Sequence, residues 1–392
     1  MTSKLTSLNR FASRKLAGLE RRNLRRKLAQ TQTLDAVAVE RDGQRLINFC
    51  SNDYLGLSHH PEVIEASRQA VLEHGTGSGA SRLVTGGHPL LFELEQRLAA
   101  FKGTQDCIIF GSGYLANLAI TPALLGSTDL VLIDEYAHAC LHSGAQLSRA
   151  RVEMFRHNDM DDLAAKLEAT RSDARNAMIL TDGVFSMDGD IAPLPALLEL
   201  AEQYDTWLLV DDAHGIGTVA GGRGAAHVFT PAAKAPLQMG TLSKALGSYG
   251  GYLAASHQVC ELLRTRARPL VFTTAPPPAA IAAALKALDL IEQQPDLCER
   301  PLELARRFCA AAGLPDPASP IVPVILGDET RALEASERLR QAGLLVAAIR
   351  PPTVPKGTAR LRVTFSAAHS ETDVDRLAKA VQDIRLQCEA AQ

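Results

Sequence analysis

Residues 177–215, AMILTDGVFSMDGDIAPLPALLELAEQYDTWLLVDDAHG, decide the fold class of this chain. Two short apolar runs, residues 177–182 and 206–212, each end in polar residues, and the pattern between them at residues 193–204 is helical. Apolar strands that alternate with helices in this way are typical of parallel strands joined by crossover helices. The stretch therefore predicts part of a parallel sheet that is covered by helices.

The same alternation continues on both sides of this stretch. Further apolar runs predict strands at residues 106–110, 129–134 and 236–240. Helical patterns occupy residues 61–74, 88–102, 114–125, 138–148 and 159–171. We therefore expect an α/β fold with a mostly parallel, doubly wound sheet, and chemistry at the carboxyl ends of its strands.

The chain of 392 residues is long enough for one large and one small domain. Residues 36–50 predict two strands around the turn Asp42-Gly43, and residues 278–293 predict a long helix. The patterns that follow predict helices at 300–312, 330–342 and 371–387 and strands at 321–326, 344–349 and 360–365. We expect a large domain of residues 49–290, a small α+β domain of residues 291–392, and an N-terminal segment, residues 1–48, that packs with the small domain.

The composition excludes several classes of protein. The net charge of −3 argues against a dedicated nucleic-acid-binding protein, which would carry a strongly basic surface. The seven cysteines form no C-x-x-C pair, so neither a zinc ribbon nor a disulfide framework is indicated. No apolar run approaches the roughly 20 residues of a membrane span. We expect a cytoplasmic protein with reduced thiols that binds neither nucleic acid nor a membrane.

Polar groups at three predicted strand ends fit together chemically. VDDAHG (210–215) places carboxylates after a strand, FGSGYLAN (110–117) joins a strand to a helix through glycines, and MGTLSKALGSYGG (239–251) carries Lys244 among small residues. Each stretch alone has an ordinary structural explanation: the first as a capped strand end, the second as a turn, and the third as a loop with a solvated lysine. Together they offer a carboxylate for a ring nitrogen, a helix N-terminus for a phosphate and an amine for an aldehyde. That combination predicts a site for pyridoxal phosphate (PLP), although a non-catalytic nucleotide-binding protein with the same sheet stays an alternative.

VDDAHG followed by TLSKALGSYGG resembles the fold-type I PLP enzymes and, among them, the α-oxoamine synthases, which join an amino acid to an acyl thioester with loss of carbon dioxide. The similarity covers nearly the whole chain, through FCSNDYLGLSHHP (49–61), GTGSGASRLVTGG (75–87), DEYAHACLHSG (134–144), TDGVFSMDGDIAPL (181–194) and IRPPTVPKGTARLRVTFSAAH (349–369). NDYLGLSHHP and the last of these stretches look most like members that condense L-alanine with pimeloyl-[acyl-carrier protein] or pimeloyl-CoA. Members that use glycine with acetyl-CoA or succinyl-CoA, and an aminotransferase of the same fold, are the alternatives.

The resemblance implies that Lys244 binds the PLP aldehyde as a Schiff base and then acts as acid and base at the substrate α-carbon. It places Asp211 against the ring nitrogen, stacks His138 on the ring, and puts His214 near the ring hydroxyl or the incoming carbonyl. The other residues that it assigns to the cofactor are Gly113, Tyr114, Ser186, Thr241 and Ser243, with Thr273 and Thr274 reaching the phosphate from a partner subunit. It thus implies a homodimer with its active site at the subunit interface.

For the amino-acid substrate, the resemblance implies that Asn52 and Arg362 hold the carboxylate. It also implies that Thr353 and His138 contact substrate. Arg360 and Arg362 are two residues apart on a predicted strand and point the same way, so periodicity does not separate them. The choice of Arg362 rests on the motif.

For the acyl substrate, the resemblance implies contact with a basic residue of the N-terminal segment. The spacing to SNDYLG favours Arg26 over Arg21 and Arg25. His138 and His142 form an H-x-x-x-H pair that could share one helix face, but residue 139 is alanine where a zinc protease would have glutamate. We therefore expect no metal.

Overall fold

The computed structural model describes residues 6–22, 24–25 and 28–390. A seven-stranded sheet forms its centre, in the order β4-β10-β9-β8-β7-β5-β6. The strands are β4 (Asp106–Phe110), β5 (Leu130–Asp134), β6 (Arg151–Phe155), β7 (Ala177–Asp182), β8 (Trp207–Asp211), β9 (Leu237–Thr241) and β10 (Gly251–Ala255). Strands β5 to β9 pair in parallel, whereas β10 is antiparallel to β4 and β9. The predicted mostly parallel sheet is confirmed.

The sequence patterns do not predict β6 and β10. Strand β6 lies at the edge of the sheet, and only Phe155 of its five residues is buried, so it has no continuous apolar run. Strand β10, GYLAA, is buried throughout but contains glycine and two alanines, which have low strand propensity. Pairing with neighbours on both sides, rather than local preference, makes it a strand.

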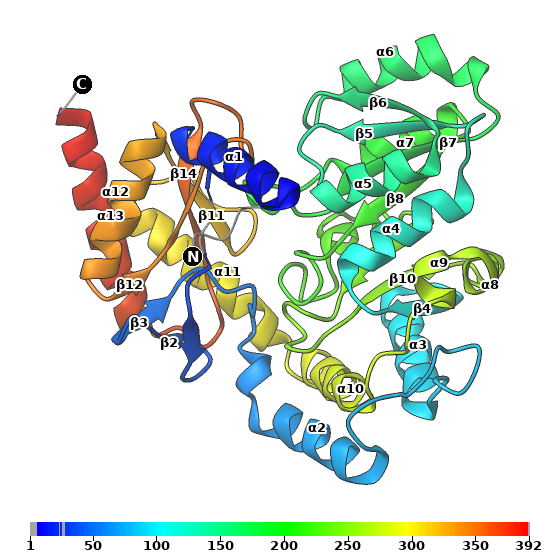
Figure 1. Ribbon diagram of the computed structural model, residues 1–392, viewed down its shortest axis with the longest axis horizontal. Coiled ribbons are helices and arrows are strands. Elements are labelled where there is room, and N and C mark those ends of the chain that lie inside the picture. The colour runs from blue at the N-terminus through cyan, green and yellow to red at the C-terminus, as the bar shows by residue number, and fades with distance from the viewer. Residues whose placement is uncertain (1–5, 23, 26–27, 391–392) are drawn as a thin grey trace.

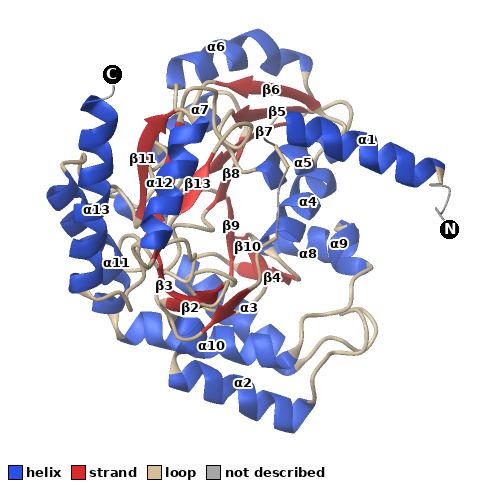
Figure 2. Cartoon of the chain, turned by 60° about the vertical axis from the view of Figure 1, so that its left-hand side comes forward, coloured by secondary structure: helices blue, strands red, loops and turns tan. Residues whose placement is uncertain are grey.

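Helices cover both faces of the sheet (Figure 1 and Figure 2). One apolar cluster joins the sheet to α3, α6, α7 and α10, and a second joins its other face to α4, α5, α8 and α9. Two cores of this kind define a doubly wound fold. The helices of this part are α2 (Pro61–His74), α3 (Pro89–Lys102), α4 (Gly113–Leu124), α5 (Ala139–Ser148), α6 (Met160–Thr170), α7 (Leu194–Gln203), α8 (His257–Arg266), α9 (Arg268–Val271) and α10 (Pro278–Gln293), with 3-10 turns η1 (Leu57–His59), η2 (Arg171–Asp173) and η3 (Ala225–Val228).

The C-terminal part is a smaller α+β unit. Its three-stranded antiparallel sheet has the order β11-β14-β13 and packs with three helices around a separate apolar cluster. These elements are α11 (Pro295–Ala312), β11 (Ile321–Gly327), α12 (Glu329–Gln341), β13 (Ala347–Ile349), β14 (Ala359–Thr364) and α13 (Glu371–Ala390). Arg362 thus reaches the large sheet from a strand of the smaller unit.

Strands from the beginning of the chain form a third sheet with a strand of the C-terminal part. Its order is β1 (Thr31–Thr33), β2 (Ala38–Arg41), β3 (Gln44–Asn48) and β12 (Leu344–Leu345). Ile47 pairs in parallel with Leu344. Helix α1 (Ser7–Arg21) has no buried residue and projects from the molecule in Figure 2. Among the described residues, no helix is long and apolar enough to cross a membrane.

Candidate active site

The candidate site lies where the parallel strands of the large sheet end. Strands β7, β8 and β9 end at Asp182, Asp211 and Thr241, and parallel pairing brings these ends to one edge. A cavity of 240 Å³ opens there. Its lining contains most of the residues that the sequence assigns to the cofactor: Gly113, Tyr114, His138, Asp211, His214, Thr241, Ser243 and Lys244. Ser112, Cys140, Asp182, Ala213 and Met239 complete it.

Lys244 follows β9 and extends its amine into this cavity. Its Nζ lies 2.7 Å from Nε2 of His214. Burial lowers the pKa of Lys244 to about 8, although the charges of Asp211 and Asp182 oppose this shift. A neutral amine is the form that attacks an aldehyde, so Lys244 is better prepared for that reaction than a solvated lysine.

His214 links Lys244 to a buried tyrosine that the sequence analysis does not single out. Its Nδ1 lies 2.7 Å from Oη of Tyr54. Burial, together with the charge of Lys244, lowers the pKa of His214 well below its ordinary value. A neutral imidazole therefore connects the amine to the phenol. Tyr54 stands in the quoted NDYLG stretch, but a single aromatic residue that follows Asn and Asp gives no local indication of chemistry.

Two carboxylates line the cavity, and they have different surroundings. Asp211 accepts hydrogen bonds from Nδ2 of Asn117 at 2.6 Å and from the backbone of Ala213 at 3.0 Å. Asp182 accepts one from the backbone N–H of His138 at 3.0 Å. Burial and the nearby charge of Asp211 raise the pKa of Asp182 well above its ordinary value. Because it accepts more hydrogen bonds on its carboxylate oxygens, Asp211 is the better candidate to lie beside a ring nitrogen.

His138 lies one residue outside the helix that was predicted to contain it. It is the N-cap of α5, and its Nδ1 lies 2.7 Å from Sγ of Cys140. The predicted helix, residues 138–148, thus agrees with α5 to within one residue at its start.

The start of α4 forms a cradle that suits a phosphate. A Cβ atom on Gly113 would lie 3.2 Å from Cε of Met239, and one on Gly251 would lie 2.6 Å from Cα of Gly113. These glycines therefore let the backbone of β10 approach the helix start closely. Oγ1 of Thr241 lies 2.7 Å from Oγ of Ser243 beside this cradle. A helix N-terminus, an amine and a carboxylate around one cavity fit PLP.

Arg362 and Asn52, the predicted carboxylate anchors, lie together beside Tyr54. Both Nη atoms of Arg362 are 3.3 Å from Oδ1 of Asn52, and Nη2 is 3.4 Å from the Tyr54 hydroxyl. Its Nε donates to the carbonyl of Ser186. Arg360 instead forms an ion pair with Asp188. The two arginines share a strand face, but only Arg362 reaches the residues around Lys244.

A second cavity of 870 Å³ adjoins the first, and His138 lines both. Ser186 and Thr353 line this larger cavity and not the smaller one. Its other walls are residues 135–139, His142, residues 185–188 and the proline-rich loop 351–356. The structure therefore separates these two predicted contacts from the cofactor cradle.

The two threonines predicted to reach the phosphate of a partner subunit, Thr273 and Thr274, line neither cavity. Thr274 pairs with Ser81 in an isolated bridge, and neither Thr273 nor Thr274 lines the cavity of this protomer. Their predicted role in a partner subunit stays a prediction. Arg26 lies outside the described residues.

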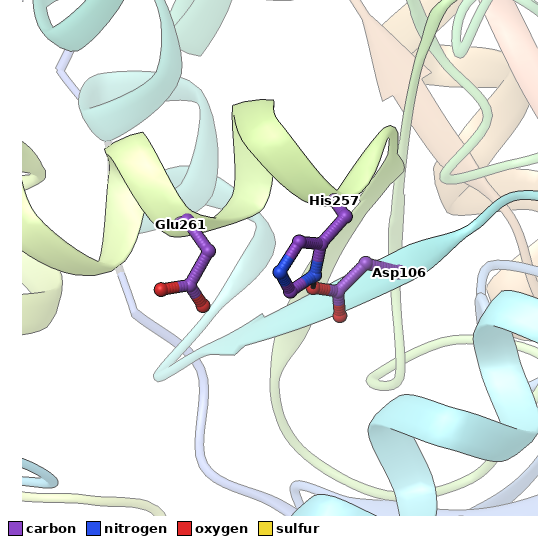
Figure 3. Close-up of side chains that lie close together, drawn as sticks. All are labelled: Asp106, His257 and Glu261. Carbon is purple, nitrogen blue, oxygen red and sulfur yellow. Dashed lines mark hydrogen bonds and ion pairs between the residues drawn. The ribbon is translucent and has the colours of Figure 1, made fainter.

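One group of side chains, Asp106, His257 and Glu261, has the spacing of a metal site among the described residues (Figure 3). It lies at the opposite end of β4 from the cavity. Arg264 already pairs with Asp106 at 2.8 Å and with Glu261 at 2.7 Å. Because this arginine compensates both carboxylates, the group is explained as a surface ion-pair network.

Comparison with known proteins gives a consistent result. The model of the family "Aminotransferase class I and II" matches residues 44–381. An 8-amino-7-oxononanoate synthase of Maricaulis maris is 67% identical over 392 residues, covering all of both chains. Another, of Methylorubrum extorquens, is 57% identical over 378 residues, or 96% of each chain.

Two solved structures share the fold. A serine palmitoyltransferase from S. paucimobilis with bound PLP superimposes with a TM-score of 0.90 at 29% identity, over 98% of this chain and 100% of that one. An 8-amino-7-oxononanoate synthase from Francisella tularensis gives 0.76 at 27% identity, over 88% of this chain and 99% of that one. The resemblance drawn from the motifs is confirmed. The chain belongs to the aminotransferase class I and II family and, within it, to the PLP-dependent 8-amino-7-oxononanoate synthases of biotin biosynthesis.

Proposed function

We propose that this chain condenses L-alanine with a pimeloyl thioester and releases carbon dioxide, giving 8-amino-7-oxononanoate. The observation that carries this proposal is one connected set of contacts. Lys244 touches His214, His214 touches Tyr54, and Tyr54 lies between Asn52 and Arg362. An amine that can move a proton is thereby held at a fixed place relative to a cationic anchor for a carboxylate.

The side chains have separate tasks in this proposal. PLP, when bound, supplies a cationic ring that accepts electrons from the substrate α-carbon. Asp211 keeps the ring nitrogen protonated, and Lys244 removes and returns the proton at the α-carbon. Arg362 and Asn52 hold the alanine carboxylate. By holding the carboxylate, these two residues would also fix the orientation of the substrate α-carbon relative to Lys244.

The larger cavity is the proposed place for the acyl donor. It adjoins the cofactor cavity at His138 and is walled by Thr353 and the prolines of its loop. With 870 Å³ it has room for a seven-carbon acyl chain and the thioester end of its carrier. Whether that carrier is a protein or coenzyme A is one variable of the experiment below.

We also propose that the active enzyme is a homodimer. Large apolar side chains are exposed near the predicted partner contacts: Leu83 at 65%, Val84 at 75% and Phe272 at 72%. Apolar patches of this kind are typically covered in an assembly. A second copy that covers them would also bring Thr273 and Thr274 toward the neighbouring site.

The proposed function is tested by supplying the purified protein and PLP with alanine, glycine or serine, each with pimeloyl-CoA or a pimeloyl carrier protein. Mass analysis identifies the products. We expect 8-amino-7-oxononanoate from alanine, with release of one carbon dioxide for each product. A clear preference for glycine or serine, or amino transfer without carbon dioxide release, would contradict the proposal.

A further inference from the structure

Asn117 is a fully buried polar residue to which the family resemblance assigns no role. It lies in α4, and its Nδ2 is 2.6 Å from Oδ2 of Asp211 and 3.1 Å from Sγ of Cys140. A buried amide is costly to place unless it makes good hydrogen bonds; here the Nδ2 group makes them, whereas Oδ1 has no partner among the described residues. Its position is therefore expected to serve the carboxylate that it contacts.

The packing of α4 against α5 holds Asn117 in this place. A Cβ atom on Gly144 of α5 would lie 2.3 Å from the carbonyl oxygen of Asn117, so only glycine allows the two helices to come this close. The close approach brings Cys140 of α5 to the Asn117 amide. Sγ of Cys140 also lies 2.7 Å from Nδ1 of His138. A continuous line of polar contacts thus joins Asp211, through Asn117 and Cys140, to His138.

The two carboxylates of the cavity differ in the donors that they receive. Both are buried, but Asp211 accepts a side-chain amide and a backbone N–H, whereas Asp182 accepts one backbone N–H among the described residues. Hydrogen bonds to the ionised form of a carboxylate favour that form. The Asn117 amide is the side-chain donor that distinguishes Asp211 from Asp182.

We propose that Asn117 is a positioning residue that orients the Asp211 carboxylate toward the PLP ring nitrogen and favours Asp211 over Asp182 as the ionised partner. Through Cys140 it also fixes the distance between this carboxylate and the His138 ring, which lines the same cavity. The inference rests on the role proposed above for Asp211. It adds a residue that touches neither cofactor nor substrate.

The test compares Asn117→Leu, which keeps the number of side-chain heavy atoms and removes the donor, with wild type and two further variants. Asn117→Gln keeps an amide donor. Asn176→Leu is a matched control, because Asn176 makes a similar 2.9 Å bond to a carboxylate, Asp129, outside the site. Each protein is loaded with PLP labelled with nitrogen-15 in its ring. The readouts are the nitrogen shift across pH and the dissociation constant of PLP.

In wild type and Asn176→Leu, we expect a ring nitrogen that stays protonated across the stable pH range. In Asn117→Leu we expect it to lose its proton within that range and PLP to bind roughly tenfold more weakly, since a hydrogen bond to a charged group is lost. Asn117→Gln should restore part of the ring-nitrogen protonation and part of the affinity for PLP. If Asn117→Leu does not fold, Asn117→Ala, which leaves space instead of a clash, replaces it.

The experiment distinguishes a failure of the role inferred for Asn117 from a failure of the role proposed for Asp211. If Asn117→Leu or Asn117→Ala keeps the protonated nitrogen and the PLP affinity of the Asn176→Leu control, the inference is overturned. If wild type itself shows an unprotonated ring nitrogen, or Asp211→Asn changes nothing, then the role proposed for Asp211 fails instead.

Discussion

The reactivity of Lys244 gives a prediction that can be worked out from the structure. Burial lowers the pKa of its amine from 10.5 to about 8. At pH 7 about one Lys244 in ten is then neutral, against about one ordinary lysine in three thousand, a difference of about 300-fold. We therefore expect covalent capture of PLP by the apoenzyme to accelerate about tenfold for each pH unit up to a midpoint near pH 8, and then to level off.

Charge variants shift this midpoint in opposite directions. Asp211 raises the pKa of Lys244 and Arg362 lowers it. Asp211→Asn should therefore move the midpoint to lower pH, and Arg362→Gln should move it to higher pH. The assay follows the absorbance change on mixing apoenzyme with PLP over a series of pH values, with Lys244→Ala as the blank. A rate that keeps rising to pH 10, or two variants that shift the midpoint the same way, would refute this reasoning.

Three further predictions concern other residues. Tyr54→Phe removes the 2.7 Å contact with His214, so kcat should fall about tenfold in steady-state assays, and an unchanged kcat would contradict the proposed link. Arg362→Lys keeps the charge but loses the paired donors, so KM for alanine should rise about tenfold or more, and an unchanged KM would argue against its role as anchor. The pKa of His157 is raised to about 10, because contacts with Asp134 and a second carboxylate outweigh the burial that lowers it. His157 should therefore stabilise the fold below pH 6.5, a contribution lost as the pH rises toward 10, so urea unfolding should separate wild type from His157→Gln only at the lower pH.

Much of this fold is predictable because its central strands are buried on both faces. Such strands read as continuous apolar runs, as at residues 177–182, and their ends mark the site. The edge strand β6 and the antiparallel β10 were not predictable in this way. Their pairing depends on residues distant in the sequence, which no local pattern contains.

The residues of the candidate site that belong to sequence motifs were predictable. The buried residues that contact and hold them were not. Lys244, Asp211 and Gly113 stand at strand or helix ends, where position alone indicates chemistry. Asn117 lies inside the otherwise apolar helix α4, and Tyr54 follows polar residues in a loop; both are fully buried. What each of them does depends on which atom of another element it meets, and only the folded chain determines that.

The central claim is that the Lys244 amine binds PLP in the cavity that Asp211 lines. The measurement that tests it most directly is reduction of the PLP-loaded enzyme with borohydride, followed by peptide mass analysis. We predict one PLP label for each chain, on the peptide that contains Lys244. A label on a different lysine, or full turnover by Lys244→Ala, would contradict the account.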